Sequence, residues 1–306
     1  MKNLFAMLLT LALCLSVGAM AAPSEDRAGE PIRLPETIEK IVSMPPSTTR
    51  VLTDLGLADR LLAVDTYSAG YQPELASLPQ FDMMAPDTEQ LAALQPDVIF
   101  ITGMSLAGGD NPYQALIDLG IAVVQIPSSS SIADIQQDVL FIGDCVGAQE
   151  KAQALVDDMQ AAIDEIAAIG ATVTEKKRVA VEVAALPYLC CAGGNTYLDE
   201  MLTLIGAENA YADSEPWASV TEEAAVAANP DVILTCISYL DDPVGEILGR
   251  EGWGEVAAIA NGQVYRLDDE SSNQPNHRIV IALRQMAEAV YPELYGATDA
   301  AACGAD

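Results

Sequence analysis

The chain has 306 residues, 51% of them hydrophobic, and a formal net charge of −31 at pH 7. Such an acidic surface repels nucleic acid and anionic lipid head groups, so neither is an expected partner. The length exceeds the size of one ordinary domain, about 150 residues, and provides enough chain for two cores.

Residues 1–21 have the layout of a cleavable secretory signal peptide. Lys2 precedes an apolar run over residues 4–17, and small residues follow up to Ala21. This pattern predicts cleavage near Ala21 and an extracytoplasmic location, in the periplasm or at the outer face of the cytoplasmic membrane. Cys14 follows Leu-Ala-Leu, so a lipid anchor at this cysteine is the alternative.

Short β-rich runs alternate with helical stretches in the rest of the chain, which is typical of parallel sheets covered by helices. We predict two α/β lobes, residues 36–146 and 171–296, each with a central, mostly parallel sheet flanked by helices. Residues 22–35 are predicted to be a flexible N-terminal segment, and 297–306 a tail. The predicted strands are 40–44, 61–65, 97–102 and 122–126 in the first lobe, and 178–184, 231–236 and 263–267 in the second.

A single long helix is predicted between the lobes, at residues 147–170. Leu155, Met159, Ile163 and Ile166 recur there at helical spacing. At 1.5 Å per residue the stretch from Ala148 to Ile169 would be about 33 Å long, enough to bridge two small domains. Periodicity alone leaves open the alternative of one more packing helix within a lobe.

A short internal repeat supports two equivalent lobes. Residues 88–99 align with residues 222–233, and both copies end in Pro-Asp-Val-Ile. Each copy predicts a short capped helix, a proline that ends it and a buried parallel strand that begins at the aspartate. Glu89 and Glu223 fall in the first turn of these helices, where a negative charge meets the positive end of the helix dipole.

Several segments together resemble the ABC-importer substrate-binding proteins that carry cobalamin, ferric siderophores and haem. No single segment is specific, but they occur in the family's order from about Pro35 to Tyr295. The segments are 41–49, 55–65, 95–99, Trp217 with Val220 and Glu223, 261–265, and 291–292.

The resemblance implies two α/β lobes joined by one long helix, with the solute held between them. It implies a monomeric binding protein rather than an enzyme, with no cofactor, which delivers a metal chelate to an ABC permease and its ATPase. A corrinoid is the first candidate for the chelate, and a ferric siderophore or haem the next. Glu89 and Glu223 stand where the family places one acid per lobe against arginines of the permease.

Ligands of open α/β sheets lie beyond the carboxyl ends of the strands, near helix N-termini. Aromatic side chains there can stack on a planar ligand, although each could instead be a half-buried core residue. Arg278 could pair with an anionic group of the ligand or with one of the protein's own acids. The predicted cleft residues are Pro46, Ser47, Tyr67, Met104, Tyr188, Trp217, Tyr239 and Arg278.

His277 is the only histidine, which disfavours a site for free zinc or manganese, so no metal site is predicted. It could be an axial ligand to haem iron or corrinoid cobalt. A solvent-facing or helix-capping histidine is the more ordinary alternative.

Two other functional classes compete with a transport protein. An extracellular hydrolase would use Cys190 or Ser105 as nucleophile with His277 as base, but no Gly-x-Ser-x-Gly or His-Glu-x-x-His motif accompanies them. A ligand-sensing partner of a membrane receptor would share the fold and the cleft. The irregularly spaced cysteines predict small buried residues rather than a disulfide framework.

Overall fold

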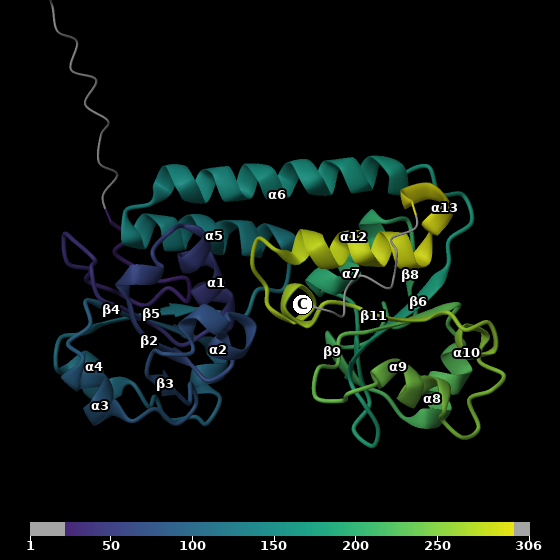
Figure 1. Ribbon diagram of the computed structural model, residues 1–306, viewed down its shortest axis with the longest axis horizontal. Helices are drawn as coiled ribbons and strands as arrows, with labels where there is room; N and C mark the ends of the chain where they lie inside the picture. The colour runs from purple at the N-terminus through teal and green to yellow at the C-terminus, as the bar shows by residue number, and fades with distance from the viewer. Residues whose placement is uncertain (1–21, 297–306) are drawn as a thin grey trace, which may run out of the picture.

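The computed structural model describes residues 22–296, so the predicted signal peptide with Cys14 and the tail 297–306 lie outside the described residues. Between residues 22 and 296, no helix combines the length and the apolar character needed to cross a membrane. The chain forms two α/β lobes, and one long helix, α6 (Gln149–Gly170), runs along both of them (Figure 1).

The N-terminal lobe contains a five-stranded sheet in the order β3-β2-β1-β4-β5, in which every neighbouring pair is parallel. The four strands predicted here are confirmed to within one residue at each end. The two-residue strand β3 is too short to leave a hydrophobic period in the sequence. The elements are β1 (Ile41–Ser43), α1 (Pro46–Asp54), β2 (Leu61–Asp65), α2 (Ser68–Tyr71), β3 (Gln80–Phe81), α3 (Thr88–Ala93), β4 (Val98–Thr102), α4 (Gln114–Asp118), β5 (Ala122–Ile126) and α5 (Ile132–Val146).

The C-terminal lobe contains a six-stranded, mixed sheet in the order β11-β10-β6-β7-β9, with β8 paired to β6. The three predicted strands are confirmed, but β7, β8 and β9 were not predicted. Strand β7 pairs antiparallel with both β6 and β9, and its three small residues give no periodic signal. The elements are β6 (Arg178–Ala184), β7 (Cys190–Ala192), α7 (Tyr197–Leu204), β8 (Glu208–Asn209), β9 (Trp217–Ser219), α8 (Glu222–Ala228), β10 (Val232–Thr235), α9 (Pro243–Leu248), α10 (Ala257–Ala260), β11 (Val264–Arg266), α11 (Asp269–Asn273), α12 (Ile279–Val290) and α13 (Pro292–Tyr295).

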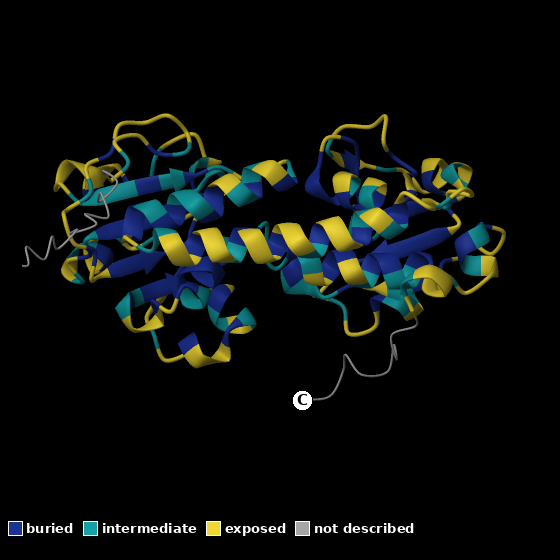
Figure 2. Cartoon of the chain, turned by 90° about the horizontal axis from the view of Figure 1, so that it is seen from above, coloured by how far each residue is buried: buried dark blue, intermediate teal, exposed yellow. Residues whose placement is uncertain are grey.

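Helix α6 packs against α5 of the first lobe and α12 of the second, while its outer face is exposed (Figure 2). Its buried seam contains Val156, Met159, Ile163 and Ile166. The seam differs from the predicted one, since Val156 is buried and the neighbouring Leu155 only half-buried. A 22-residue helix is about 33 Å long, so α6 reaches from one lobe to the other.

Both ends of α6 are fixed to the lobes. At its start, Lys151 Nζ donates a hydrogen bond of 2.7 Å to the carbonyl of Leu55, at the end of α1. At its end, the backbone of Gly170 lies so close to α7 that an added Cβ atom would be 2.0 Å from the carbonyl oxygen of Leu204. Only glycine allows this approach, because any side chain would push the helix off the C-terminal lobe.

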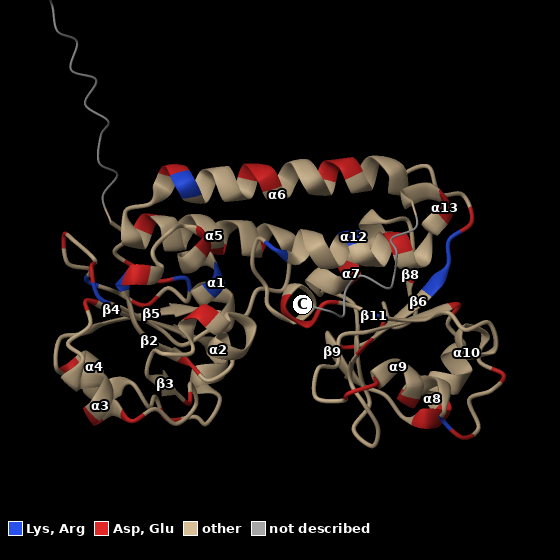
Figure 3. Cartoon of the chain, viewed as in Figure 1, with Lys and Arg blue, Asp and Glu red and all other residues tan. Residues whose placement is uncertain are grey.

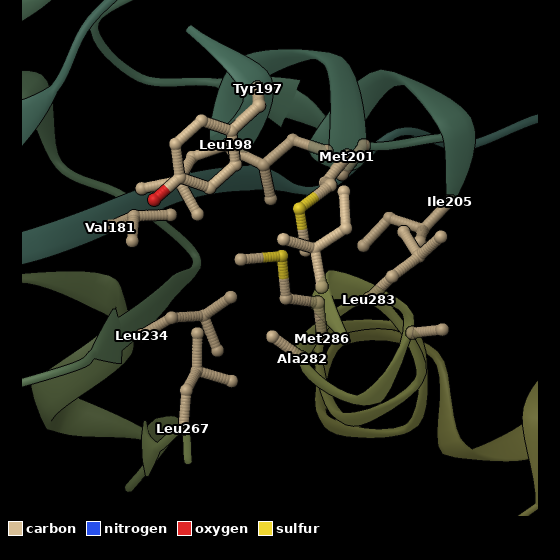
Figure 4. Packing of buried hydrophobic residues seen from close by; sticks show 14 of the residues in the cluster. Val181, Tyr197, Leu198, Met201, Ile205, Leu234, Leu267, Ala282, Leu283 and Met286 are labelled. Atoms are coloured by element: carbon tan, nitrogen blue, oxygen red, sulfur yellow. The ribbon is translucent and has the colours of Figure 1, made fainter. Parts of the chain in front are cut away.

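The core of the C-terminal lobe extends into the start of α5. Figure 4 shows Leu198 and Met201 of α7, and Ile205 just after it, facing Leu283 and Met286 of α12, with Val181 and Leu234 of the sheet beside them. Two residues of α5, Ile132 and Ile135, belong to the same apolar cluster. The backbone amide of Ile132 also donates to Glu200 of α7 at 2.8 Å, so α5 forms a second link between the lobes.

The two copies of the repeat fold alike. The residue before each proline has a left-handed backbone, with φ of 50° at Gln95 and 44° at Asn229. The aspartates just before β4 and β10 then connect to neighbouring strands: Asp97 accepts the backbone amide of Lys40 at 2.9 Å, and Asp231 that of Arg178 at 2.8 Å. The repeat therefore sets both the turn and the strand register in each lobe.

Candidate functional site

A cavity of about 530 Å³ lies between the lobes, within the usual size range of small-molecule sites. Its N-terminal wall is built where β1, β2, β4 and β5 end and the following loops leave the sheet. Its C-terminal wall is narrower and comes from α7, β9 and the end of α11. This position agrees with the rule that ligands bind beyond the carboxyl ends of parallel strands.

Five of the eight predicted cleft residues line this cavity: Pro46, Ser47, Tyr67, Met104 and Trp217. The first four follow β1, β2 and β4 of the N-terminal lobe, and Trp217 begins β9 of the other lobe. Tyr67 and Trp217 expose 64% and 52% of their surface. Two half-free aromatic side chains therefore stand on opposite walls of one cavity.

The conformation of the Tyr67 loop is fixed by a buried carboxylate. Asp65, at the end of β2, is fully buried and accepts the backbone amides of Tyr67 at 2.8 Å and Ser68 at 3.1 Å. The hydroxyl of Ser68 also donates to Asp65 and lies 3.0 Å from that of Thr49. Burial raises the pKa of Asp65 although these donors oppose the shift. The network holds the loop that presents Tyr67 to the cavity.

Trp217 is supported by Tyr197, a cavity residue that the sequence analysis missed. The two rings pack edge to face with their centroids 6.5 Å apart. The Tyr197 hydroxyl donates to the carbonyl of Ser272 at 2.7 Å, which fixes the ring at the start of α7. Trp217 lies on the edge strand β9, so its backbone is held by the sheet.

Tyr188, Tyr239 and Arg278 do not line this cavity. Tyr188 and Tyr239 are exposed on the C-terminal lobe, and the Tyr239 hydroxyl accepts the backbone amide of Ala185 at 2.8 Å. Arg278 makes a bidentate ion pair with Asp54 of α1, at 2.8 and 3.0 Å. The alternative in which Arg278 pairs with one of the protein's own acids is therefore the one observed.

A second arginine is engaged in the same way across the lobes. Arg50, one turn before Asp54 on α1, makes a bidentate ion pair with Glu270 of α11. Helix α1 thus contributes one cationic and one anionic side chain, and each pairs with an opposite charge on the C-terminal lobe. Burial alone would raise the pKa of Asp54, but hydrogen bonds from His277 and Arg278 outweigh it and lower the pKa to about 2.

His277 is buried in this interlobe contact rather than solvent-facing or helix-capping. Its Nε2 atom lies 2.9 Å from Oδ2 of Asp54, and its buried Nδ1 atom has no partner. The residue does not line the cavity, and one ring nitrogen contacts Asp54 while the other is buried. The interpretation of His277 as an axial ligand therefore has no support from its position.

The residues of the hydrolase hypothesis are not assembled. The hydroxyl of Ser105 is part of the capping box that begins a short 3₁₀ helix, where it accepts the amide of Thr102 at 3.3 Å. Cys190 lies on β7, and burial raises its pKa, which disfavours the thiolate. Since His277 contacts Asp54 instead, neither nucleophile has the base that the hypothesis requires.

Asp138 of α5 is the cavity residue that the sequence analysis should have found. It lines the cavity and is 6% exposed, and Ser129 donates to its Oδ2 atom at 2.6 Å. In the sequence it stands between Ile135 and Ile142 at a helical position that faces the core. An acid within an apolar stripe is the signal that would have identified it.

The N-terminal segment 22–35, expected to be flexible, is held against the N-terminal lobe. Asp26 accepts the amides of Ala28 and Glu30, and Arg27 donates its backbone amide to the carbonyl of Gln125 in β5 at 3.2 Å. The side chain of Arg27 then pairs with Asp138, Nε to Oδ1, at 2.6 Å. These contacts fasten the segment to the edge of the sheet, beside the cavity.

Glu89 and Glu223 are both exposed in the first turns of α3 and α8. Both helices are capped as predicted: Asp87 accepts the amide of Gln90, and Thr221 that of Ala224. Figures 1 and 3 show α3 and α8, each with acidic residues, on the side of the two lobes away from α6. The two acids therefore belong to one side of the molecule.

The sequence and the fold of the chain are similar to those of known proteins. Residues 41–271 match the family model described as "Periplasmic binding protein". An uncharacterized ABC transporter substrate-binding lipoprotein, YvrC of Bacillus subtilis, is 29% identical over 89% of this chain and 86% of its own. A vitamin B12-binding protein of Salmonella paratyphi A is 28% identical over 94% of this chain and 98% of its own. The periplasmic heme-binding protein RhuT of Roseiflexus shares the fold with a TM-score of 0.73 and 22% identity, covering 83% of this chain and 98% of that one.

Proposed function

Because the chain belongs to the periplasmic binding protein family, we propose that it is the solute-binding component of an ABC importer and that its cargo is a corrinoid. A ferric siderophore or haem is the next candidate. The protein would act outside the cytoplasmic membrane as a monomer without catalysis, after removal of residues 1–21 or with a lipid anchor at Cys14.

The observation that carries the choice of cargo is that the two interlobe arginines are paired with the protein's own acids. Arg50 and Arg278, the two arginines that could have received an anionic ligand, are engaged by Glu270 and Asp54. No Lys or Arg stands among the lining residues within 22–296. Haem propionates and the acidic groups of ferric siderophores would enter without a partner, and an unpaired buried charge is costly. A corrin ring edged with neutral amides avoids this cost.

The walls of the cavity suit a large, flat ligand. Tyr67 and Trp217 come from different lobes and expose their rings to the same space, so a planar macrocycle could be held between them. Aromatic contacts of this kind do not depend on the sign of charge of the ligand. Relatives named for vitamin B12 binding support the same cargo.

We also propose that Glu89 and Glu223 dock the loaded protein on the permease. Both acids are exposed on the side away from α6, one on each lobe. A pair of acids separated by two lobes fits a partner that presents one basic patch to each lobe, and such complementary charges set register more than affinity.

Tryptophan fluorescence tests the proposed cargo. The chain has two tryptophans, of which Trp217 lines the cavity and Trp253 is 2% exposed. Saturable quenching is expected with cyanocobalamin and weaker quenching with hemin and ferric siderophores. In Trp217→Phe the quenching should disappear while calorimetry still detects binding. If cyanocobalamin neither quenches nor releases heat, the proposal is wrong.

A further inference from the structure

Asp138 is the only Asp, Glu, Lys or Arg among the residues that line the cavity in the described part of the chain. Its neighbours along the wall are apolar side chains, hydroxyls and amides. The single charge of the wall therefore lies on one carboxylate of α5. Any cargo that fills the cavity meets this group.

The carboxylate is held in place on two sides. Ser129, in the loop before α5, donates to Oδ2, and Arg27 of the N-terminal segment donates to Oδ1, both at 2.6 Å. Each carboxylate oxygen can accept a second hydrogen bond, so both retain capacity for a ligand. The group is fixed in position and still able to accept.

The charge state of Asp138 depends on these partners. Burial raises its pKa, Ser129 and Arg27 oppose that shift, and Asp134 one turn earlier adds to it. Arg27 is the only cation within this set. Without it, the carboxyl would accept a proton closer to neutral pH, and the wall would lose its negative charge.

Arg27 itself is placed by the backbone of its segment. Asp26 receives the amides of Glu30 and Gln125 at 2.9 and 3.1 Å, and Ile32 packs into the core of the N-terminal lobe. A short fixed turn at the edge of the sheet therefore places the guanidinium against Asp138.

Building on the proposed function, we propose that Asp138 determines the specificity of the cleft, selecting cargo whose edge carries hydrogen-bond donors, and that Arg27 is its positioning residue. A primary amide donates to the carboxylate, whereas a carboxylate at the same place on the ligand is repelled. The Asp138 carboxylate thus attracts an amide of the ligand and repels a carboxylate at the same position.

Two corrinoids with the same ring test the selection. Cobinamide carries primary amides at the ring edge, and cobyrinic acid carries carboxylates in their place. The wild type should prefer cobinamide, and Asp138→Asn should reduce the ratio of the two dissociation constants by about ten- to a hundredfold, the usual effect of a charge-assisted hydrogen bond. Asp144→Asn, on the same helix but outside the cavity, should leave the ratio unchanged.

A folded Asp138→Asn protein with the wild-type ratio would overturn the selection. If that variant does not fold, Ser129→Ala serves instead, since it removes one holder of the carboxylate and should reduce the same ratio. A wild type that binds neither corrinoid would overturn the proposed function itself, which is a different result from binding both equally.

The pH profile tests the role of Arg27. In the wild type, the affinity for cobinamide should be flat between pH 8 and pH 6. In Arg27→Gln it should fall several-fold over this range, because Asp138 becomes protonated as the pH decreases. Arg33→Gln removes the same charge from an exposed position of the segment and is the matched control. Identical profiles for the two variants would exclude the positioning role.

Discussion

The two lobes share one repeated element but differ in the polar groups that they bury. In the N-terminal lobe the buried acid Asp65 has no cation and is satisfied by Ser68 and two backbone amides. In the C-terminal lobe the buried acid is Glu182 of β6, which makes a bidentate ion pair with Arg250 at 2.9 Å for both contacts. Arg250 also lies over the ring of Trp253, 4.7 Å from its centroid.

The two buried acids therefore serve different purposes: Asp65 orders a loop at the cavity, and Glu182 stabilises the interior of its lobe. Asp65 orders the loop of Tyr67, which lines the cavity, whereas neither Glu182, Arg250 nor Trp253 lines it. The donors that hold Asp65 are all neutral, and Asp138 is the only charged side chain among the described residues that line the cavity. The ion pair of the other lobe lies outside the cavity.

The buried pair should give the largest effect on stability. Arg250→Leu leaves Glu182 buried without its cation, and the free energy of unfolding should fall by about 3–5 kcal/mol. Ser68→Ala, in the network of the other lobe, should cost only about 1–2 kcal/mol. Urea unfolding measures both. Arg284→Leu, which removes an exposed pair with Glu165, should change little, and an equally small loss in Arg250→Leu would refute the contrast between the lobes.

The docking acids test whether the lobes contribute equally outside the cavity. Charge reversal at Glu89 or Glu223 should reduce cargo uptake about tenfold, and the double reversal about a hundredfold, because each lobe loses one contact. Binding of cargo to the purified protein should be unchanged. Asp158→Lys, on the exposed face of α6, is the control. If either reversal weakens cargo binding itself, these acids do not act in docking.

The interlobe contact should make stability depend on acid pH. The pKa of Asp54 is lowered from 3.8 to about 2, so this stabilisation is present above about pH 4 and is lost as the pH falls toward 2. Asp54→Asn should lower the free energy of unfolding by about 2 kcal/mol at pH 6. The difference from the wild type should shrink as the pH falls to 2.5. A difference that stays constant, or an equal loss in Asp59→Asn, would contradict this origin.

The smallest effect is expected at the turn that the two lobes share. Asn adopts a left-handed backbone more easily than Gln, so Gln95→Asn should raise the free energy of unfolding by about 0.5–1 kcal/mol. The reverse change, Asn229→Gln, should lower it by about 1 kcal/mol, since the Asn229 side chain also accepts the amide of Ala257 at 2.8 Å. Equal signs for the two changes, measured by urea unfolding, would break the equivalence of the copies.

The sequence was informative where a pattern was local. The seven predicted strands each left a hydrophobic run, and the two copies of Pro-Asp-Val-Ile marked equivalent turns. Strands β3, β7, β8 and β9 contain two or three residues and exist because a neighbouring strand holds them. Their formation depends on pairing across the sheet, which no local period reports.

A site residue could be predicted where its position after a strand alone places it at the cavity. Tyr67 and Met104 follow strands and line the cavity as the strand-end rule requires. Arg278 also lies in a loop, but its role depends on Asp54, which is more than two hundred residues away in the sequence. Arg27 and Asp138 meet through a segment that looked merely polar. Charge pairing between distant segments is set by the fold, so residue type at one position could not reveal it.

Helix α6 is attached rigidly at both ends, by Lys151 to one lobe and by the contact of Gly170 with α7 to the other. Because neither end of α6 can pivot, the lobes can approach each other only as far as the helix itself bends. An α-helix curves only gently. Loading and unloading therefore involve small elastic strain rather than a swing. Any side chain at Gly170 would weaken the attachment of α6 to the C-terminal lobe and allow that lobe to rotate relative to the helix.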